Sequence, residues 1–480
     1  MAHPEVWYDL VVEPKTASPS IGEVLTVKVD RMAPAGDGLA KAEGSNRVVF
    51  VPGAAPGDRL EVTVFDAKSN FARARITKVL SSGPERIDPP CQHHAAPSRP
   101  GPACGGCDWQ HLAYDSQLKH KREIVVDCVS RIGKFPEADK LVLPTLRAPK
   151  PWGYRNKVQI PFMAGPHGPR MGFFSAGSRE IVDMKECPIQ PDMSARIAFK
   201  VKAMAIERGW TFYDGKTGRG WLRHLYIRTN AEGQALVALV TTHQEFSDRE
   251  VFAAELRANF PEIVGIHQNI QPERTSVVLG PVWRRLWGQR ELEETLGRFH
   301  FAASPGAFLQ VNTPAAEVLY NAAKDAVKEG GKKFPMGLDL YCGVGTLTLW
   351  LADVFPRIVG VEENKDAISD AYRNAERNRV RNARFKAGRA ESVLPKLAQE
   401  LPDNSCVVVD PPRVGLSQPV RRFLTDKKIK RLVYVSCDPA TFARDAGFLS
   451  HSGYVLRRVQ PVDLFPQTSH VELVGLMDRK

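Results

Sequence analysis

The amino-terminal part of the chain alternates apolar and polar residues with a period of two. The alternating stretches, separated by turns rich in Gly, Pro and Asp, lie at residues 25–30, 47–51, 60–64 and 72–77. This alternation predicts short β-strands that each bury one face. Strands at this spacing predict a small barrel over residues 16–80. Arg73 and Arg75 fall on its solvent side, where they suit a nucleic-acid backbone.

The middle of the chain, residues 81–300, shows mixed patterns. Residues 81–103 are rich in Pro, Ser and His and read as a linker. Apolar residues recur on one helical face from 115 to 132, so a helix is expected there, ending at Gly133. Residues 234–240 read as a buried strand. We expect a central domain of the α+β class.

After residue 300 the chain alternates strands and helices. Thr313 and Pro314 form a good N-cap and first position for a helix that runs to about residue 328. Apolar strands are expected at residues 337–341, 358–361, 405–409 and 432–436. This order predicts a doubly wound, Rossmann-like parallel sheet over residues 301–480, with its site at the carboxyl ends of the strands. The fold class is therefore α/β, with an amino-terminal barrel.

Length, composition and net charge restrict the classes of function that this chain can have. The 480 residues, 43% of them hydrophobic, suffice for two to four domains. Lys and Arg number 66 against 54 Asp and Glu, a net charge of +12, which favours nucleic acid as partner over a membrane surface. A basic soluble enzyme is the alternative. No apolar run is long enough to span a membrane and no export signal is visible, so a cytoplasmic protein with reduced cysteines is expected.

The end of the first strand of this domain carries a glycine turn. Gly343 and Gly345 allow a tight turn and close approach of a ligand. A dinucleotide site would need a third glycine at position 348, which is Thr, so an adenosyl cofactor without a pyrophosphate is favoured. Glu362 ends the next strand, where its carboxylate can accept both ribose hydroxyls. A plain glycine turn with a surface glutamate is the alternative.

The last two strand ends carry groups suited to covalent catalysis. Asp410 precedes two prolines that fix the backbone beside the cofactor, and Cys437 follows the last of these strands. A thiolate that adds to C6 of uracil makes C5 nucleophilic towards a sulfonium methyl group, and a base must then remove the C5 proton. Glu472 is the candidate base, with His470 as its rival.

The remaining cysteines suggest a metal. Cys104-Gly-Gly-Cys107 is preceded by Cys91 and followed at a distance by Cys187. The two glycines let the thiolates converge and free backbone N–H groups to bond to sulfur. Four thiolates suit either zinc or an iron–sulfur cluster, and the spacing does not choose between them. His93 and His94 could also join a zinc site.

Together these motifs resemble the RNA uracil-5 methyltransferase family, and most closely its bacterial branch that acts on 23S ribosomal RNA. The resemblance extends over residues 16–480, including the Phe308-Leu-Gln-Val-Asn312 segment. It implies a TRAM barrel that binds RNA and a central domain with a [4Fe–4S] cluster. The residues implied in binding S-adenosylmethionine are Gln310, Tyr341, Glu362 and Asp410, the implied nucleophile and base are Cys437 and Glu472, and the implied cluster ligands are Cys91, Cys104, Cys107 and Cys187.

The resemblance leads to one expected activity and two alternatives. We expect a monomer that methylates C5 of one uridine in large-subunit ribosomal RNA after flipping the base out of its stack. The same chemistry on the T-loop uridine of transfer RNA, or on two ribosomal sites, is the first alternative. A non-catalytic RNA-binding protein is the second.

Overall fold

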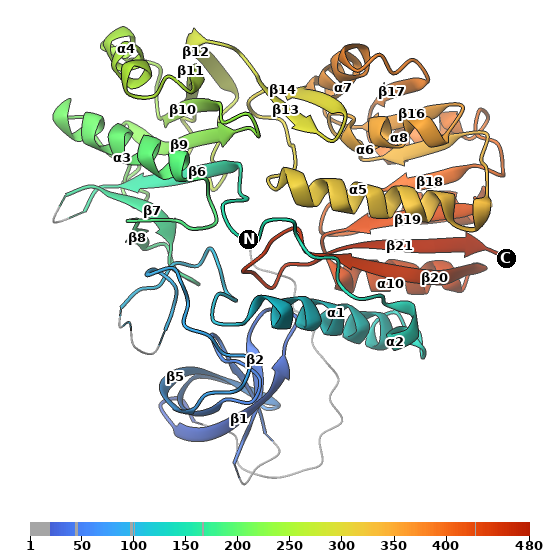
Figure 1. Ribbon diagram of the computed structural model, residues 1–480, viewed down its shortest axis with the longest axis horizontal. Helices are drawn as coiled ribbons and strands as arrows, with labels where there is room; N and C mark the ends of the chain where they lie inside the picture. The colour runs from blue at the N-terminus through green and yellow to red at the C-terminus, as the bar shows by residue number, and fades with distance from the viewer. Residues whose placement is uncertain (1–19, 44–46, 97–98, 100, 166–167, 428) are drawn as a thin grey trace. The chain divides into compact units, whose positions relative to one another are not determined.

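The computed structural model describes residues 20–43, 47–96, 99, 101–165, 168–427 and 429–480 (Figure 1). The amino-terminal residues in which we looked for an export signal lie outside these ranges. The chain divides into two compact units: the first combines Met1–Ala103, Cys107–His120 and Gln467–Ser469, and the second contains the rest. No helix of the described ranges is both long and apolar enough to cross a membrane.

The first unit contains the predicted barrel. Its closed strand order is β1-β2-β3-β5-β4. The strands are β1 (Val24–Met32), β2 (Gly38–Ala42), β3 (Val48–Val51), β4 (Arg59–Ala67) and β5 (Phe71–Ser81). Every second residue points inward, as Val27, Val49 and Leu60 do, and fills a small apolar core. On β5 the predicted outward arginines alternate with buried alanines, and Arg75 is exposed. The barrel prediction is therefore confirmed.

The second unit contains a mixed seven-stranded sheet in the order β12-β11-β10-β9-β6-β7-β8. The strands are β6 (Lys157–Met163), β7 (Arg170–Phe174), β8 (Ile181–Asp183), β9 (Leu222–Thr229), β10 (Ala235–Thr241), β11 (Ile263–Ile270) and β12 (Val282–Gly288). Helices α3 (Asp192–Glu207) and α4 (Arg249–Asn259) bury their apolar stripes in one core with this sheet. A separate hairpin, β13 (Leu292–Leu296) and β14 (Phe299–Ala303), follows.

A second seven-stranded sheet forms the carboxyl-terminal part of this unit, in the order β17-β16-β15-β18-β19-β21-β20. The strands are β15 (Gly337–Leu340), β16 (Ile358–Glu362), β17 (Ala383–Ala387), β18 (Cys406–Val409), β19 (Arg431–Ser436), β20 (Tyr454–Val462) and β21 (Glu472–Arg479). The first five run parallel, whereas β21 lies between β19 and β20 and is antiparallel to both. The Rossmann-like α/β class is thus confirmed.

Helices cover both faces of this sheet, so its strands are buried on two sides. The apolar core on one face takes in α5 (Thr313–Lys328), α6 (Thr346–Trp350) and α7 (Lys365–Arg377), and Figure 1 shows α5 running across the sheet. The core on the other face takes in α8 (Ala390–Leu397), α9 (Gln418–Asp426) and α10 (Pro439–Ser450). The short elements are α2 (Ala138–Leu141), η1 (Glu329–Gly331) and η2 (Ala352–Val354).

Two predicted helices can be compared with the structure at their ends. The helix predicted over 115–132 is α1 (Tyr114–Arg131), and the prediction is confirmed. The helix predicted from Thr313 is α5, but its N-cap is Asn312, whose side chain accepts a hydrogen bond from the backbone N–H of Ala315 at 3.3 Å. The N-cap prediction was one residue late, because an asparagine carbonyl caps as well as a threonine hydroxyl.

Candidate active site

The candidate residues of the second unit meet at the carboxyl edge of its parallel sheet. Tyr341 follows β15, Glu362 ends β16, Asp410 follows β18 and Cys437 follows β19. Glu472 is the first residue of β21, which runs antiparallel and therefore starts where β19 stops. Strand ends at one edge of an open α/β sheet form the crevice in which ligands bind.

Strand register sets Cys437 opposite Glu472. The last paired residues of β19 and β21 are Ser436 and Leu473. One step further along this register Cys437 comes opposite Glu472, whose charge raises the pKa of the thiol. Glu472 is only 5% exposed, whereas Cys437 is half-buried. Asp438 fixes the turn after β19, because its carboxylate caps α10 by accepting the N–H of Thr441 at 2.9 Å. The sulfur therefore sits on a rigid turn.

Burial and mutual repulsion raise the pKa values of these three acids. Burial, followed by the charges of Glu472 and Asp410, raises the pKa of Cys437 to about 12. Burial and then Asp410 raise the pKa of Glu472 to about 8, and burial raises that of Asp410 to about 6. Arg413, from the Asp-Pro-Pro-Arg segment, is the cation that lowers the pKa of both Cys437 and Glu472. A cationic ligand would favour ionisation of the whole group.

The glycine turn after β15 forms an open cradle. Gly343 has φ +54° and a Cβ placed there would meet no atom within 4 Å. Gly345 has φ +84° and packs close to Phe385, where a Cβ would come to 3.0 Å. Both conformations favour glycine. The Glu362 carboxylate is held in place by the backbone N–H groups of Gly343 at 3.2 Å and Asn364 at 2.9 Å. The turn and the carboxylate thus form one preorganised surface.

Sequence reasoning missed two supports of this turn. Thr348, noted only for not being glycine, donates its hydroxyl to the fully buried Asp339 at 2.5 Å. Burial raises the pKa of Asp339 to about 7, and the charges of Asp410 and Glu362 add to the shift. Tyr320 on α5 shares a hydrogen bond of 3.1 Å with Thr346. No local pattern signals these contacts, since each joins side chains from different elements.

Gln310 and His470 do not lie at the ends of the parallel strands but in the segments that precede α5 and β21. Gln310 is half-buried in the segment before α5, and the neighbouring Val311 carbonyl accepts the N–H of Asn156 at 2.8 Å. His470 is exposed and its ring lies 6.1 Å from that of Phe465. His470 and Glu472 are only two positions apart in the chain, but the His470 side chain is exposed and the Glu472 side chain is buried.

The four cysteines of the expected cluster divide between the two units. Cys91 and Cys107 belong to the first unit, and Cys104 and Cys187 to the second. Locally, the N–H of Gly106 points to Cys104 Sγ at 3.4 Å, as expected for a glycine spacer. Within the described ranges no set of three or more His, Cys, Asp or Glu residues forms a group that could hold a metal ion. The cluster gains no support here and stays a prediction.

The remaining three cysteines are core residues, as their sequence context suggested. Cys128, Cys342 and Cys406 are all buried, and burial raises the pKa of each thiol. Cys406, on β18, is fully buried within the apolar core on one face of the sheet. These thiols are therefore protonated and buried, whereas the Cys437 thiol at the carboxyl edge is half-buried.

Comparisons with known proteins agree with this arrangement. The family described as tRNA (uracil-5-)-methyltransferase matches residues 285–480, and the TRAM domain matches residues 20–77. An uncharacterized RNA methyltransferase of Halalkalibacterium halodurans is 36% identical over 459 residues, which cover 95% of this chain and 97% of that relative. An uncharacterized RNA methyltransferase of Clostridium acetobutylicum is 35% identical over 454 residues, which cover 94% of this chain and 96% of that relative.

A solved structure extends the comparison to the fold. The tRNA (uracil-54, C5)-methyltransferase of Pyrococcus abyssi, in complex with S-adenosyl-L-homocysteine, is 27% identical with a TM-score of 0.72. The match covers 94% of this chain and all of that one. The identity and coverage of the relatives, together with the barrel and the site at the sheet edge, show that this chain belongs to the tRNA (uracil-5-)-methyltransferase family of RNA methyltransferases.

Proposed function

We propose that this protein transfers a methyl group from S-adenosyl-L-methionine to C5 of a uridine in RNA through a covalent bond to Cys437. The observation that carries the proposal is the register of β19 and β21, which sets Cys437 opposite Glu472 at the carboxyl edge of the sheet. A thiol and a carboxylate on opposite strands can act on two adjacent atoms of one ring. Family membership supports the same chemistry.

The residues around the glycine turn fit the proposed cofactor. The Gly343–Gly345 turn leaves open space for a ligand, and the Glu362 carboxylate is preorganised beside it to accept ribose hydroxyls. Tyr341, Asp410 and Gln310 would complete the cofactor site. S-adenosyl-L-methionine would supply an electrophilic methyl group on a positively charged sulfur. The acidic character of this edge suits a cationic ligand.

The chain's own residues carry the remaining steps. The Cys437 thiol first loses its proton, an ionisation that a cationic ligand at this edge favours. The thiolate sulfur then bonds to C6 of the uracil, and the electrons of the C5–C6 double bond move into the ring carbonyl. With S-adenosyl-L-methionine bound, C5 would take the methyl carbon as the bond from that carbon to the sulfonium sulfur breaks, and S-adenosyl-L-homocysteine would be the leaving group. C5 would still hold its proton at this point. Glu472 removes that proton, the double bond reforms, and the Cys437 sulfur leaves C6. Glu472 is better placed than His470 because it is buried on the strand opposite the thiol.

We infer 23S ribosomal RNA as the substrate, with transfer RNA as the competing candidate. The ribosomal proposal rests on the resemblance of the cysteine spacing and the barrel to the ribosomal branch. The transfer-RNA candidate is supported by the Pyrococcus abyssi protein, which aligns over 94% of this chain. Mass spectrometry of nucleosides from separated ribosomal and transfer RNA decides this, using cells with and without the gene. Loss of 5-methyluridine from transfer RNA alone would overturn the ribosomal proposal.

The proposed division of labour follows the domain prediction. The barrel at 16–80 and the central domain at 81–300 would hold RNA, and residues 301–480 would bind the cofactor and react. Because a stacked base is out of reach of Cys437, the target uridine would leave its stack. We further propose that Cys91, Cys104, Cys107 and Cys187 ligate a [4Fe–4S] cluster with a structural role in a monomeric enzyme. Four thiol donors suit that cluster, and no catalytic step is assigned to it.

A further inference from the structure

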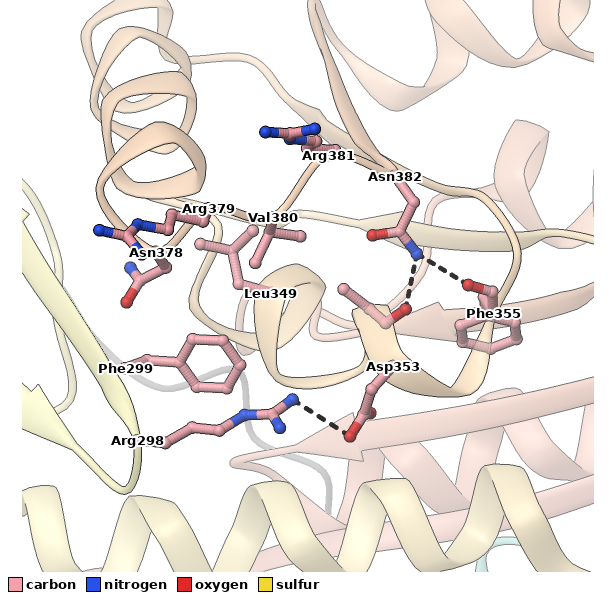
Figure 2. A pocket seen from close by; sticks show the side chains of 11 residues that line it. Arg298, Phe299, Leu349, Asp353, Phe355, Asn378, Arg379, Val380, Arg381 and Asn382 are labelled. Carbon is pink, nitrogen blue, oxygen red and sulfur yellow. Dashed lines mark hydrogen bonds and ion pairs between the residues drawn. The ribbon is translucent and has the colours of Figure 1, made fainter.

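A cavity lies at the edge of the carboxyl-terminal sheet opposite the candidate active site. It has a volume of about 600 Å³ and is lined by the β13–β14 hairpin, the α6–η2 region and the turn between α7 and β17 (Figure 2). That turn leads directly into β17, and the Asn382 carbonyl accepts the N–H of Ile358 at the start of β16. The cavity is thus at the amino ends of these strands, outside the proposed catalytic machinery.

Three arginines make this cavity strongly basic. Arg298 comes from the hairpin turn, and Arg379 and Arg381 extend outward from the α7–β17 turn in Figure 2. Asp353 is the acidic residue of the lining, and it is already shared by Arg298 at 3.2 Å and Lys324 at 2.6 Å. Arg379 and Arg381 are exposed and form no ion pair with any residue in the described ranges. Arg379 and Arg381 therefore present positive charge that the one acidic residue of the lining does not neutralise.

The backbone at Arg379 adopts a left-handed conformation that favours glycine. After α7, the N–H of Val380 bonds to the Ala375 carbonyl at 2.9 Å and the N–H of Arg379 to the Glu376 carbonyl at 3.0 Å. This is the Schellman arrangement, in which the left-handed residue is usually glycine. Arg379 occupies that position with φ +56°. Any side chain makes this conformation less favourable than glycine does, so replacing Arg379 with glycine removes the guanidinium without a conformational cost.

The floor of the cavity is apolar and aromatic. Leu349, Val380 and the ring of Phe299 line it, and the Arg298 guanidinium lies 4.9 Å from the centre of that ring. A cationic rim above an aromatic floor matches the two parts of a polynucleotide, whose phosphates are anionic and whose sugars and bases are flat or apolar. A free inorganic anion would use the rim alone.

We propose that Arg298, Arg379 and Arg381 bind backbone phosphates of the RNA substrate at this second site. The inference rests on RNA being the substrate, as proposed above, and adds a binding surface at the edge remote from Cys437. Charge complementarity supports it, because the chain carries a net charge of +12 and two of the three arginines, Arg379 and Arg381, have no ion-pair partner among the described residues. The surface would anchor long RNAs and leave specificity to the catalytic edge.

The sharpest test exploits the left-handed conformation. Arg379→Gly should raise the thermal midpoint of the full-length protein by about 1–2 °C, since glycine suits the position. The same variant should bind unmodified ribosomal RNA, purified from cells lacking the gene, roughly threefold to tenfold more weakly. The slope of log affinity against log salt should become shallower by about 0.7–0.9 for each phosphate that the variant no longer binds. Arg298→Ala and Arg381→Ala should weaken binding similarly.

Lys396→Ala is the matched control, because Lys396 is an exposed cation on α8 outside the cavity lining. It should leave affinity and salt slope unchanged. The inference is overturned if Arg379→Gly binds RNA with wild-type affinity and slope, or if Lys396→Ala weakens binding as much. Because binding is measured without methyl transfer, a wild-type protein that binds RNA yet fails to methylate it contradicts the proposed function and not this phosphate site.

Discussion

Lys121 and Asp463 form a fully buried ion pair, with Lys121 Nζ 2.5 Å from Asp463 Oδ1 and both side chains inaccessible. Asp463 is the first residue after β20, in the loop that leads to Glu472. Lys121 also donates to the Phe465 carbonyl at 3.0 Å, so one ammonium holds two points of that loop. The position of the proposed base therefore depends on a lysine of α1 that is far away in sequence.

Replacing Lys121 tests this dependence. Lys121→Met leaves the Asp463 charge buried without its partner, so we expect the free energy of unfolding to fall by about 3–5 kcal/mol. Lys119→Met is the control on the same helix, because Lys119 is 58% exposed and its pair with Glu85 should contribute less than about 1 kcal/mol. Urea denaturation measures both. Equal stability of the two variants would show that the buried pair does not hold the loop.

The division of labour between thiol and carboxylate predicts opposite outcomes for two variants. Cys437→Ala should abolish methylation, because no sulfur can activate C5. Glu472→Gln should accumulate a covalent protein–RNA adduct that survives denaturing electrophoresis, because the C5 proton stays in place. His470→Gln should methylate normally. If His470→Gln trapped the adduct and Glu472→Gln did not, the base would be His470.

The raised pKa of Glu472 predicts a pH-dependent stability difference. Burial holds this pKa at about 8, above the usual 4.5, so the folded state binds an extra proton between these values. The stabilisation from protonated Glu472 is fully present below pH 4.5 and is lost as the pH rises through about 8. The melting temperature of Glu472→Gln minus that of the wild type should therefore be larger at pH 8.5 than at pH 5. The control Glu245→Gln, at an 89% exposed side chain, should show no such trend.

The reactivity of Cys437 should respond to its acidic neighbour. Glu472 is among the charges that raise the pKa of this thiol, so its removal should increase the thiolate fraction at pH 9. We expect iodoacetamide to label Cys437 severalfold faster in Glu472→Gln, measured by mass spectrometry of the labelled peptide. Cys406 is fully buried and should stay unlabelled in both proteins. Equal labelling of Cys437 would contradict electrostatic coupling between the two groups.

The predicted iron–sulfur cluster is tested by measuring the iron, sulfide and zinc content of the purified protein. Protein purified without oxygen should contain about four iron and four sulfide per chain if the four cysteines hold a [4Fe–4S] cluster. Replacing Cys104 with Ser should remove the iron and its visible absorbance, whereas replacing the buried Cys128 should not. One zinc per chain would overturn the iron–sulfur assignment in favour of the thiolate alternative.

Local patterns predicted local elements well. The barrel strands and α1 follow from periodicities of two and 3.6, which need only a few neighbouring residues. The cap of α5 was misplaced by one residue because Asn312 and Thr313 are both good caps. The strand ends at Tyr341, Glu362, Asp410 and Cys437 were predictable because parallel strands expose their carboxyl ends together.

Strand order was beyond the reach of the pattern. None of the strands expected after residue 300 included Glu472, yet Glu472 begins β21, which inserts between β19 and β20. Gly475 in the middle of β21 weakens its strand pattern. The structure supplies the reason for that glycine: a Cβ there would come within 2.3 Å of the Phe442 ring. Such a close approach joins segments that no periodicity connects.

The pairing of β19 with β21 also bears on how this family can vary in length. Insertions in the loop between Phe465 and Glu472 would leave the register of β21 and the contacts of Lys121 with Asp463 and Phe465 in place. Deleting one residue within β21 would turn every later side chain to the opposite face and misalign the strand with Phe442. We therefore expect insertions and deletions among relatives to occur before Glu472 and not within β21. The position at which alignment gaps end would then mark the catalytic pair.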